Sequence, residues 1–261
     1  ALTSLLPELR GSVDESTNAI DTCRAQIARC ETEPAQLRAQ YRAMLDKQTA
    51  AYDAHLRMSK TYARSSWANV EGNGTEAEKR LARVASLLID DLEKQKPVTV
   101  DDVDKRIKLL DLVANLLDEA DDLLDAIIAR ETNIDDAKNR ASEEIGLAQT
   151  DIEKAEVYIT QNADDLSSDM KRPVANAREH LDDASRELAL AQPNYLVVVK
   201  KALLANKEAD EILALAMSEH ERRESLRQQL ASTMRLFATS ADKSERFISN
   251  HSGDVGEDAS K

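Results

Sequence analysis

Aromatic residues, glycine, proline and cysteine are all scarce in this sequence. Aromatics make up 3% of the 261 residues, and the chain has 6 glycines, 5 prolines and 2 cysteines. A β-sandwich or barrel needs many turns, which so little glycine and proline does not supply, and β-branched residues never alternate over a strand-length run. What remains is rich in Ala, Leu, Asp, Glu, Arg and Lys, the composition of long helices. We therefore expect an all-α protein.

Long apolar runs and a positive charge balance are also missing. No stretch approaches the ~20 apolar residues of a membrane-spanning helix, and no basic-then-apolar leader opens the chain. The net charge of −14 disfavours nucleic acids and anionic membranes, because both bind basic surfaces. We expect protein partners, whose identity the sequence does not give, or self-association, with no nucleic acid and no direct membrane insertion.

The sequence repeats itself at a shift of 89 residues. KAEVYITQNADDLSSD, residues 154–169, aligns without gaps with KSERFISNHSGDVGED, residues 243–258. The same shift lays Glu119–Asp121 on Glu208–Asp210. A fixed period of this size is typical of a repeat array. Because the chain opens on Ala1 and stops inside the second copy, we expect it to be part of a longer protein.

Helix-breaking and capping residues mark the expected boundaries. Pro34 follows Glu33 at a place that suits the first position of a new helix. Gly72-Asn73-Gly74 predicts a turn, with Thr75 as the cap of the next helix. Thr99-Val100-Asp101-Asp102 predicts a helix N-terminus with carboxylates in its first turn, where they bind free amides.

Two long helices and one short helix are expected in the second half of the chain. One long helix, or two that meet end to end, should run from Thr99 to about Gln161. After a turn at 162–168 we expect a short helix over 169–192 and another long helix from 194. Two apolar stripes run side by side along the first long helix, so it should pack against at least two neighbours.

A long helix can contribute one half to each of two bundles. The expected fold is therefore an elongated tandem array of three-helix bundles that share continuous long helices, with a period of about 89 residues. We expect residues 1–33 to form a helix that completes a preceding or partial bundle. Residues 34–130 and 131–222 should each form a whole three-helix bundle. Residues 223–261 should form the first helix of a truncated third repeat and a flexible tail.

This architecture resembles spectrin repeats, whose three-helix bundles are joined by continuous helices. The stretch WANVEGNGTEAE at 67–78, the pairs Tyr158-Ile159 and Phe247-Ile248, and QPNY at 192–195 resemble the helical region that follows a TPM domain in some bacterial envelope proteins. The TPM domain is not in this sequence. The resemblance implies a helical repeat architecture and an envelope or extracytoplasmic setting, and no catalytic residues.

Asp121-Asp122-Leu123-Leu124-Asp125 matches the DDxxD pattern with which isoprenoid synthases bind magnesium diphosphate. That chemistry needs carboxylates one helical turn apart, which Asp121 and Asp125 provide. It also needs a second acidic motif across an apolar, usually aromatic pocket. Because Asp pairs are common in this chain, an ordinary solvated face explains the match better.

Other catalytic or metal-binding patterns are missing. A di-iron bundle needs Glu-x-x-His, and none of the four histidines has a glutamate three positions before it. No Ser or Cys lies in a nucleophile elbow. On one helix Cys23 and Cys30 would have Cα atoms about 10 Å apart, too far for a disulfide, so we expect two small buried apolar residues. No catalytic, cofactor-binding or metal-binding residue is predicted.

The sequence predicts a non-catalytic spacer or scaffold, a helical repeat rod for protein-protein interaction. Two alternatives stay open: a helical enzyme that binds magnesium diphosphate through Asp121, Asp122 and Asp125, and an acidic regulatory module that docks one protein partner. In the repeated motif, Tyr158 and Phe247 should pack their rings at helix ends, while Asp165 and Asp254 lie in or beside turns.

Overall fold

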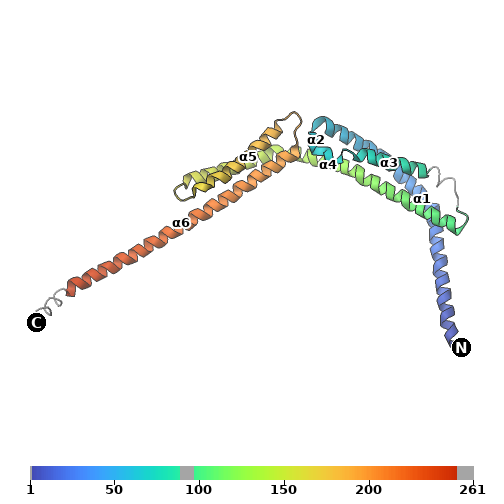
Figure 1. Ribbon diagram of the computed structural model, residues 1–261, viewed down its shortest axis with the longest axis horizontal. Coiled ribbons are helices and arrows are strands. Elements are labelled where there is room, and N and C mark those ends of the chain that lie inside the picture. The colour runs from blue at the N-terminus through green and yellow to red at the C-terminus, as the bar shows by residue number, and fades with distance from the viewer. Residues whose placement is uncertain (1, 89–96, 252–261) are drawn as a thin grey trace. The chain divides into compact units, whose positions relative to one another are not determined.

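The computed structural model describes residues 2–88 and 97–251, and within these residues the chain forms helices and the turns between them (Figure 1). The all-α expectation is confirmed for this part of the chain. The α-helices are α1 (Leu2–Thr61), α2 (Arg64–Trp67), α3 (Asn73–Ser86), α4 (Val100–Gln161), α5 (Lys171–Leu188) and α6 (Tyr195–His251), with short 3-10 helices at Ala68–Val70 and Ser168–Met170.

The helices group into two compact units. Unit 1 comprises Ala1–Asn139 together with Leu190–Leu196, and unit 2 comprises Arg140–Ala189 together with Val197–Lys261. The helices α4 and α6 therefore contribute residues to both units. Each unit has its own apolar core, and the two cores differ in the size of their side chains.

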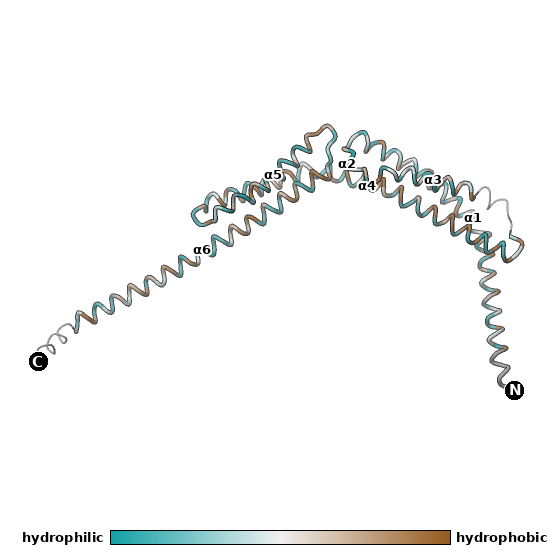
Figure 2. The backbone as a smooth tube through the Cα atoms, viewed as in Figure 1, coloured by the Kyte–Doolittle hydropathy of each residue, from teal (hydrophilic) through white to brown (hydrophobic). Residues whose placement is uncertain are grey.

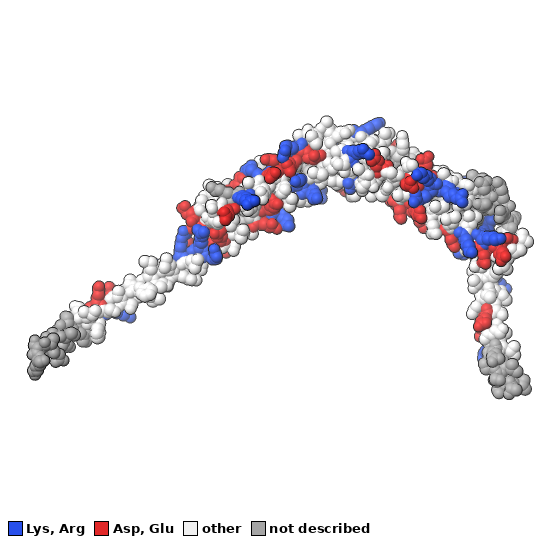
Figure 3. Space-filling view, in the orientation of Figure 1, with Lys and Arg blue, Asp and Glu red and all other residues white. Residues whose placement is uncertain are grey.

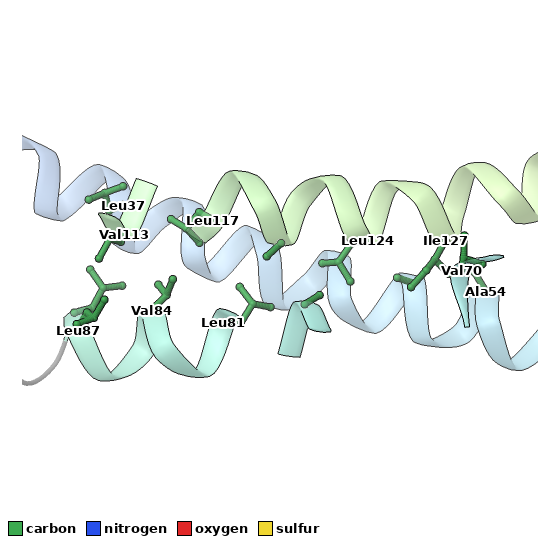
Figure 4. Close-up of a cluster of buried hydrophobic side chains, with 14 of the residues drawn as sticks. Leu37, Ala54, Val70, Leu81, Val84, Leu87, Val113, Leu117, Leu124 and Ile127 are labelled. Carbon is green, nitrogen blue, oxygen red and sulfur yellow. The ribbon is translucent and has the colours of Figure 1, made fainter. Parts of the chain in front are cut away.

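The core of unit 1 is built from large aliphatic side chains of α1, α3 and α4 (Figure 4). Apolar residues recur every three or four positions on each helix, so each presents one continuous face to the others. Trp67 closes one end of this core; it is 7% exposed, and its ring meets His55 edge to face with centroids 5.0 Å apart. The labelled core residues in Figure 4 include Leu37, Leu81, Val84, Val113, Leu117, Leu124 and Ile127.

The core of unit 2 is dominated by alanine. The helices α4, α5 and α6 bury alanines at most 1% exposed, and larger residues such as Ile152, Leu181 and Ile212 fill the space between them. Small side chains let helices approach closely, so a substitution that enlarges one of them has little room. The buried alanines of this cluster are Ala148, Ala177, Ala205, Ala209 and Ala216.

The start of α4 agrees with the sequence. Thr99 Oγ1 accepts a hydrogen bond from the Asp102 amide at 3.2 Å, and Asp102 Oδ2 accepts one from the Thr99 amide at 3.1 Å. These reciprocal bonds satisfy free amides of the first turn and lower the pKa of Asp102. The helix then continues without a break to Gln161, which confirms a single long helix and places Ile134, 0% exposed, inside it.

Three predicted boundaries are wrong. No helix starts at Pro34, because α1 runs through it and the buried proline packs into unit 1, which offsets its missing backbone bond. The helix expected after Thr75 already begins at Asn73, where the Glu76 amide donates to Gly72 O at 3.1 Å. This helix was predicted to reach residue 96, and residues 89–96 lie outside the described residues.

The third wrong boundary is the end of α5, which stops at Leu188 rather than near Gln192. Residues 190–196 belong to unit 1, where Gln192 Nε2 donates to Lys60 O at 3.1 Å and Asn194 Nδ2 donates to Ser65 Oγ at 3.0 Å. These side-chain bonds hold the segment in a conformation that a continued α5 would not allow.

Candidate docking surface on α6

The surroundings of α6 change along its length. Up to Ala216 one face of α6 is buried, with residues at steps of three or four from Val198 to Ala216. From Leu226 onward the large apolar residues are more than half exposed, and Figure 2 shows hydrophobic positions recurring along this part of the helix. We name five of them the α6 stripe: Leu226, Leu230, Met234, Phe237 and Ile248.

The α6 stripe forms one face of the helix. Its members are separated by three, four or eleven residues, which are the spacings that return to the same side of an α-helix. Their exposed fractions lie between 56% and 72%. Single exposed apolar residues are normal on a protein surface, but several on one side of a helix are typical of a contact surface.

The match of the sequence at a shift of 89 residues relates this face to a buried face of α4. The shift lays Ala137, Ala141, Ile145, Ala148 and Ile159 of α4 on the five members of the α6 stripe in order. Four of these α4 residues are at most 8% exposed, and Ile145 packs against the core of unit 2. The α6 stripe thus occupies the helix positions that face a core in α4.

The two faces differ in size. Where α4 has Ala137, Ala141 and Ala148, α6 has the larger residues Leu226, Leu230 and Phe237. Close packing is achieved when large side chains on one helix oppose small ones on its neighbour. A helix that fits the α6 stripe should therefore present small residues such as alanine at the contact.

This part of α6 also differs in charge from the rest of the chain. Residues 222–246 contain six basic and three acidic residues, although the whole chain has a net charge of −14. Figure 3 shows acidic and basic side chains gathered over the packed helices, while the viewed face of the C-terminal half of α6 is largely uncharged.

A buried carboxylate anchors α6 at the start of the stripe. The side chain of Asp165, 10% exposed, accepts two hydrogen bonds from Arg227: Nη1 donates to Oδ2 at 2.8 Å and Nη2 donates to Oδ1. The hydrogen bonds and the charge of Arg227 lower the pKa of Asp165. His220 Nδ1 lies 3.1 Å from Oδ2, and Arg223 donates to the carbonyl of Asp164. The turn after α4 is thereby fixed onto α6.

The repeated motif is placed partly as predicted. Asp165 lies in the turn after α4, and Asp254 lies outside the described residues. Tyr158 is half-buried against the core of unit 2, with its ring edge to face with His220 of α6 at 6.3 Å. Phe247 is 64% exposed, so the predicted packing of its ring is wrong within the described residues. The sequence did not reveal Arg227 as the partner of Asp165, because the pair is 62 residues apart and its arginine lies outside the motif.

The DDxxD carboxylates contact a lysine. Lys47 Nζ of α1 bonds Asp121 and lies 2.7 Å from Asp125 Oδ1, while Asp122 is exposed to solvent. Burial alone would lower the pKa of Lys47, but its hydrogen bonds with the two carboxylates outweigh this and raise it. The lysine satisfies the pair of carboxylates that a magnesium ion would need, and it ties α1 to α4.

The cysteines and the three histidines whose side chains are described lie in ordinary packing positions. Cys23 is partly exposed and Cys30 is buried, and both thiols are free. Burial raises the pKa of the Cys30 thiol. His55 packs on Trp67, and His180 lies between Lys201 and Glu208 of α6. Within residues 2–88 and 97–251, no three His, Cys, Asp or Glu side chains gather in a way that suits a metal ion.

None of the described helices combines the length and the apolar character that crossing a membrane requires. Comparison of the chain with protein-family models, curated proteins and solved structures finds no match. The α6 stripe is therefore the feature of the described helices that bears most directly on function.

Proposed function

We propose that the chain is a non-catalytic scaffold made of spectrin-like helical repeats, in which α6 provides a docking face for further helices. The proposal includes the elongated repeat array and the envelope-associated setting that the resemblance of the sequence implies. One observation supports it most: the α6 stripe has the register of the core-facing residues of α4, yet its members are more than half exposed.

The chemistry of the partner follows from the equivalent contacts in unit 2. There the α4 face packs against α5, whose buried residues include Val174, Ala177, Leu181 and Ala184. A helix of this kind, with alternating small and medium apolar residues, is what the larger side chains of the α6 stripe can accommodate. The helix can come from a further repeat of the same protein or from another protein.

A peptide corresponding to α5, residues 171–188, is a suitable probe. It should be labelled with a fluorophore and titrated with the whole chain while anisotropy is recorded. We expect saturable binding that Phe237→Asp abolishes, because a carboxylate would then lie in the apolar contact. Ser232→Asp is the matched control, since Ser232 is exposed on a different side of α6 and should leave binding unchanged.

Circular dichroism of both variants must show unchanged helix content, which is expected because neither residue is buried. The proposal is wrong if the peptide does not bind at concentrations up to ~1 mM, the weak limit for a specific contact. It is equally wrong if Phe237→Asp and the wild type bind with the same affinity.

A further inference from the structure

A second exposed apolar face lies on α1 and has a different period. It passes through Leu9, Val13, Ser16, Ile20, Cys23 and Ile27, which we name the α1 seam. The steps alternate strictly between four and three, an average of 3.5 residues. The same alternation continues into unit 1 through residues that face its core, among them Cys30 at 4%, Leu37 at 6% and Met58 at 0% exposed.

The seam is exposed although it continues a buried face. Leu9 and Val13 are each 61% exposed, Ile20 is 52% and Ile27 is 43%. Figure 1 shows the N-terminal part of α1 extending beyond α3 and the described start of α4. Cys23 and Ile27 line a pocket together with Val98 and Val103 at the start of α4, and Arg29 Nη2 donates to Asp111 Oδ1 at 2.8 Å. Unit 1 therefore begins to cover the α1 seam at Cys23, and within the described residues the seam is open from Leu9 to Ile20.

A period of 3.5 is the period of a left-handed coiled coil, in which two helices keep one narrow seam in contact. The α6 stripe does not have it, because Leu226 to Ile248 spans 22 residues in six turns, about 3.67 per turn. The α1 seam thus requires a different kind of partner from the α6 stripe.

We propose that a second copy of this chain covers the α1 seam, and that the two α1 helices form a parallel two-stranded coiled coil. In heptad terms Val13, Ile20 and Ile27 occupy a positions, and β-branched residues at a favour parallel dimers. Leu9, Ser16 and Cys23 occupy the d positions, so each layer of the parallel pair brings identical side chains together.

The charges beside the seam select the parallel direction. Arg10 and Arg24 occupy e positions, while the g positions hold Ser12, Ala19 and Gln26. In a parallel pair e faces g, so each arginine meets an uncharged residue. In an antiparallel pair of the same overlap, Arg10 of one helix would lie beside Arg24 of the other, twice per dimer, and the like charges would repel.

Cross-linking through Cys23 can distinguish a parallel from an antiparallel pair of α1 helices. In the parallel pair the two Cys23 side chains meet in one d layer, whereas in the antiparallel pair each faces Val13 and the two sulfurs are separated by about ten residues, roughly 15 Å of helix. The Cys30→Ser chain, which keeps Cys23, should be treated with diamide, which oxidises two thiols to one disulfide. We expect a covalent dimer, and its loss in the Cys23→Ser chain.

Sedimentation equilibrium of the whole chain is the second measurement. We expect a concentration-dependent monomer-dimer equilibrium that Ile20→Glu converts to monomer only. Because Ile20 lies outside the core of unit 1, the variant should keep its helix content and its Trp67 fluorescence. Phe237→Asp, which alters the α6 stripe, should leave this dimer unchanged.

A chain that stays monomeric up to millimolar concentration, or a dimer that Ile20→Glu does not weaken, overturns the proposal. A dimer that depends on Ile20 but gives no Cys23 cross-link overturns the parallel arrangement. The inference is independent of docking at α6, since it concerns another helix, and the two fail in different variants.

Discussion

The repeat register predicts that one exchange of residues has opposite consequences at two equivalent positions. Ala141 of α4 and Leu230 of α6 are related by the 89-residue shift, yet Ala141 is 0% exposed and Leu230 is 62% exposed. We consider Ala141→Leu and Leu230→Ala, which give each helix the residue of its counterpart. Both residues favour helix, so backbone propensity contributes almost nothing to either change.

The expected magnitudes follow from burial. Leucine at 141 adds three carbons where neighbouring helices already touch an alanine, and overpacking of this kind costs ~1–3 kcal/mol in the free energy of unfolding. Alanine at 230 removes side-chain atoms that are mostly in water, and exposed substitutions usually change stability by less than about 0.5 kcal/mol. The two variants should therefore differ by at least ~0.5 kcal/mol in the free energy of unfolding.

Urea unfolding monitored by circular dichroism measures the difference, with Trp67 fluorescence as an internal control. The chain has one tryptophan, and it lies in unit 1, so its transition should move little in either variant. If Ala141→Leu is neutral, the α4 face is not tightly packed. If Leu230→Ala destabilises by 2 kcal/mol or more, the α6 stripe is already covered in solution, and the reasoning on exposure is refuted.

Four further predictions follow from single residues. Gly146→Ala should stabilise the chain by ~0.5–1 kcal/mol in urea unfolding, because glycine is unfavourable inside a helix and a Cβ there would meet no atom within 4 Å. Ile134→Pro should destabilise by ~3 kcal/mol or more in the same assay, against ~0.5–1.5 kcal/mol for Ile134→Val, since proline breaks α4 at a buried position. The hydrogen bond from Arg227 lowers the pKa of Asp165 in the folded chain. The ionised Asp165 therefore stabilises the fold above its unfolded pKa of about 3.9, and this stabilisation is lost as the pH falls through the lower folded pKa. The Tm of Asp165→Asn should therefore fall less than that of the wild type on acidification below about pH 4. Magnesium titration by calorimetry should give no saturable heat at Asp121 and Asp125, and a stoichiometric signal lost in Asp121→Asn would contradict the bridging role of Lys47.

The sequence predicted the elements whose signals are local. The cap formed by Thr99 and Asp102 depends on residues three apart, and the length of α4 depends on a long interval without proline. Such short-range patterns determine most of a helix before any tertiary contact forms.

The sequence failed where distant contacts outweigh local preference. Pro34 would end most helices, but its ring is buried against unit 1, and this packing keeps α1 continuous. The early end of α5 depends on bonds from Gln192 and Asn194 to residues about 130 positions away. Lys47 lies 74 residues from Asp121, so nothing in the DDxxD motif itself indicated its partner.

The two exposed faces show how period and burial give independent information. Period depends only on the order of residues, and it separates the α1 seam, at 3.5, from the α6 stripe, at about 3.67. Burial depends on which helices are present, so residues at equivalent positions are buried in α4 and exposed in α6. A seam with a period of 3.5 residues can be buried by an identical helix, since each layer of the coiled coil then contains the same side chain from both helices. The α6 stripe is less suited to a second copy of itself, because Phe237 and Leu230 would then meet equally large side chains. A neighbouring helix with small residues fits the α6 stripe better.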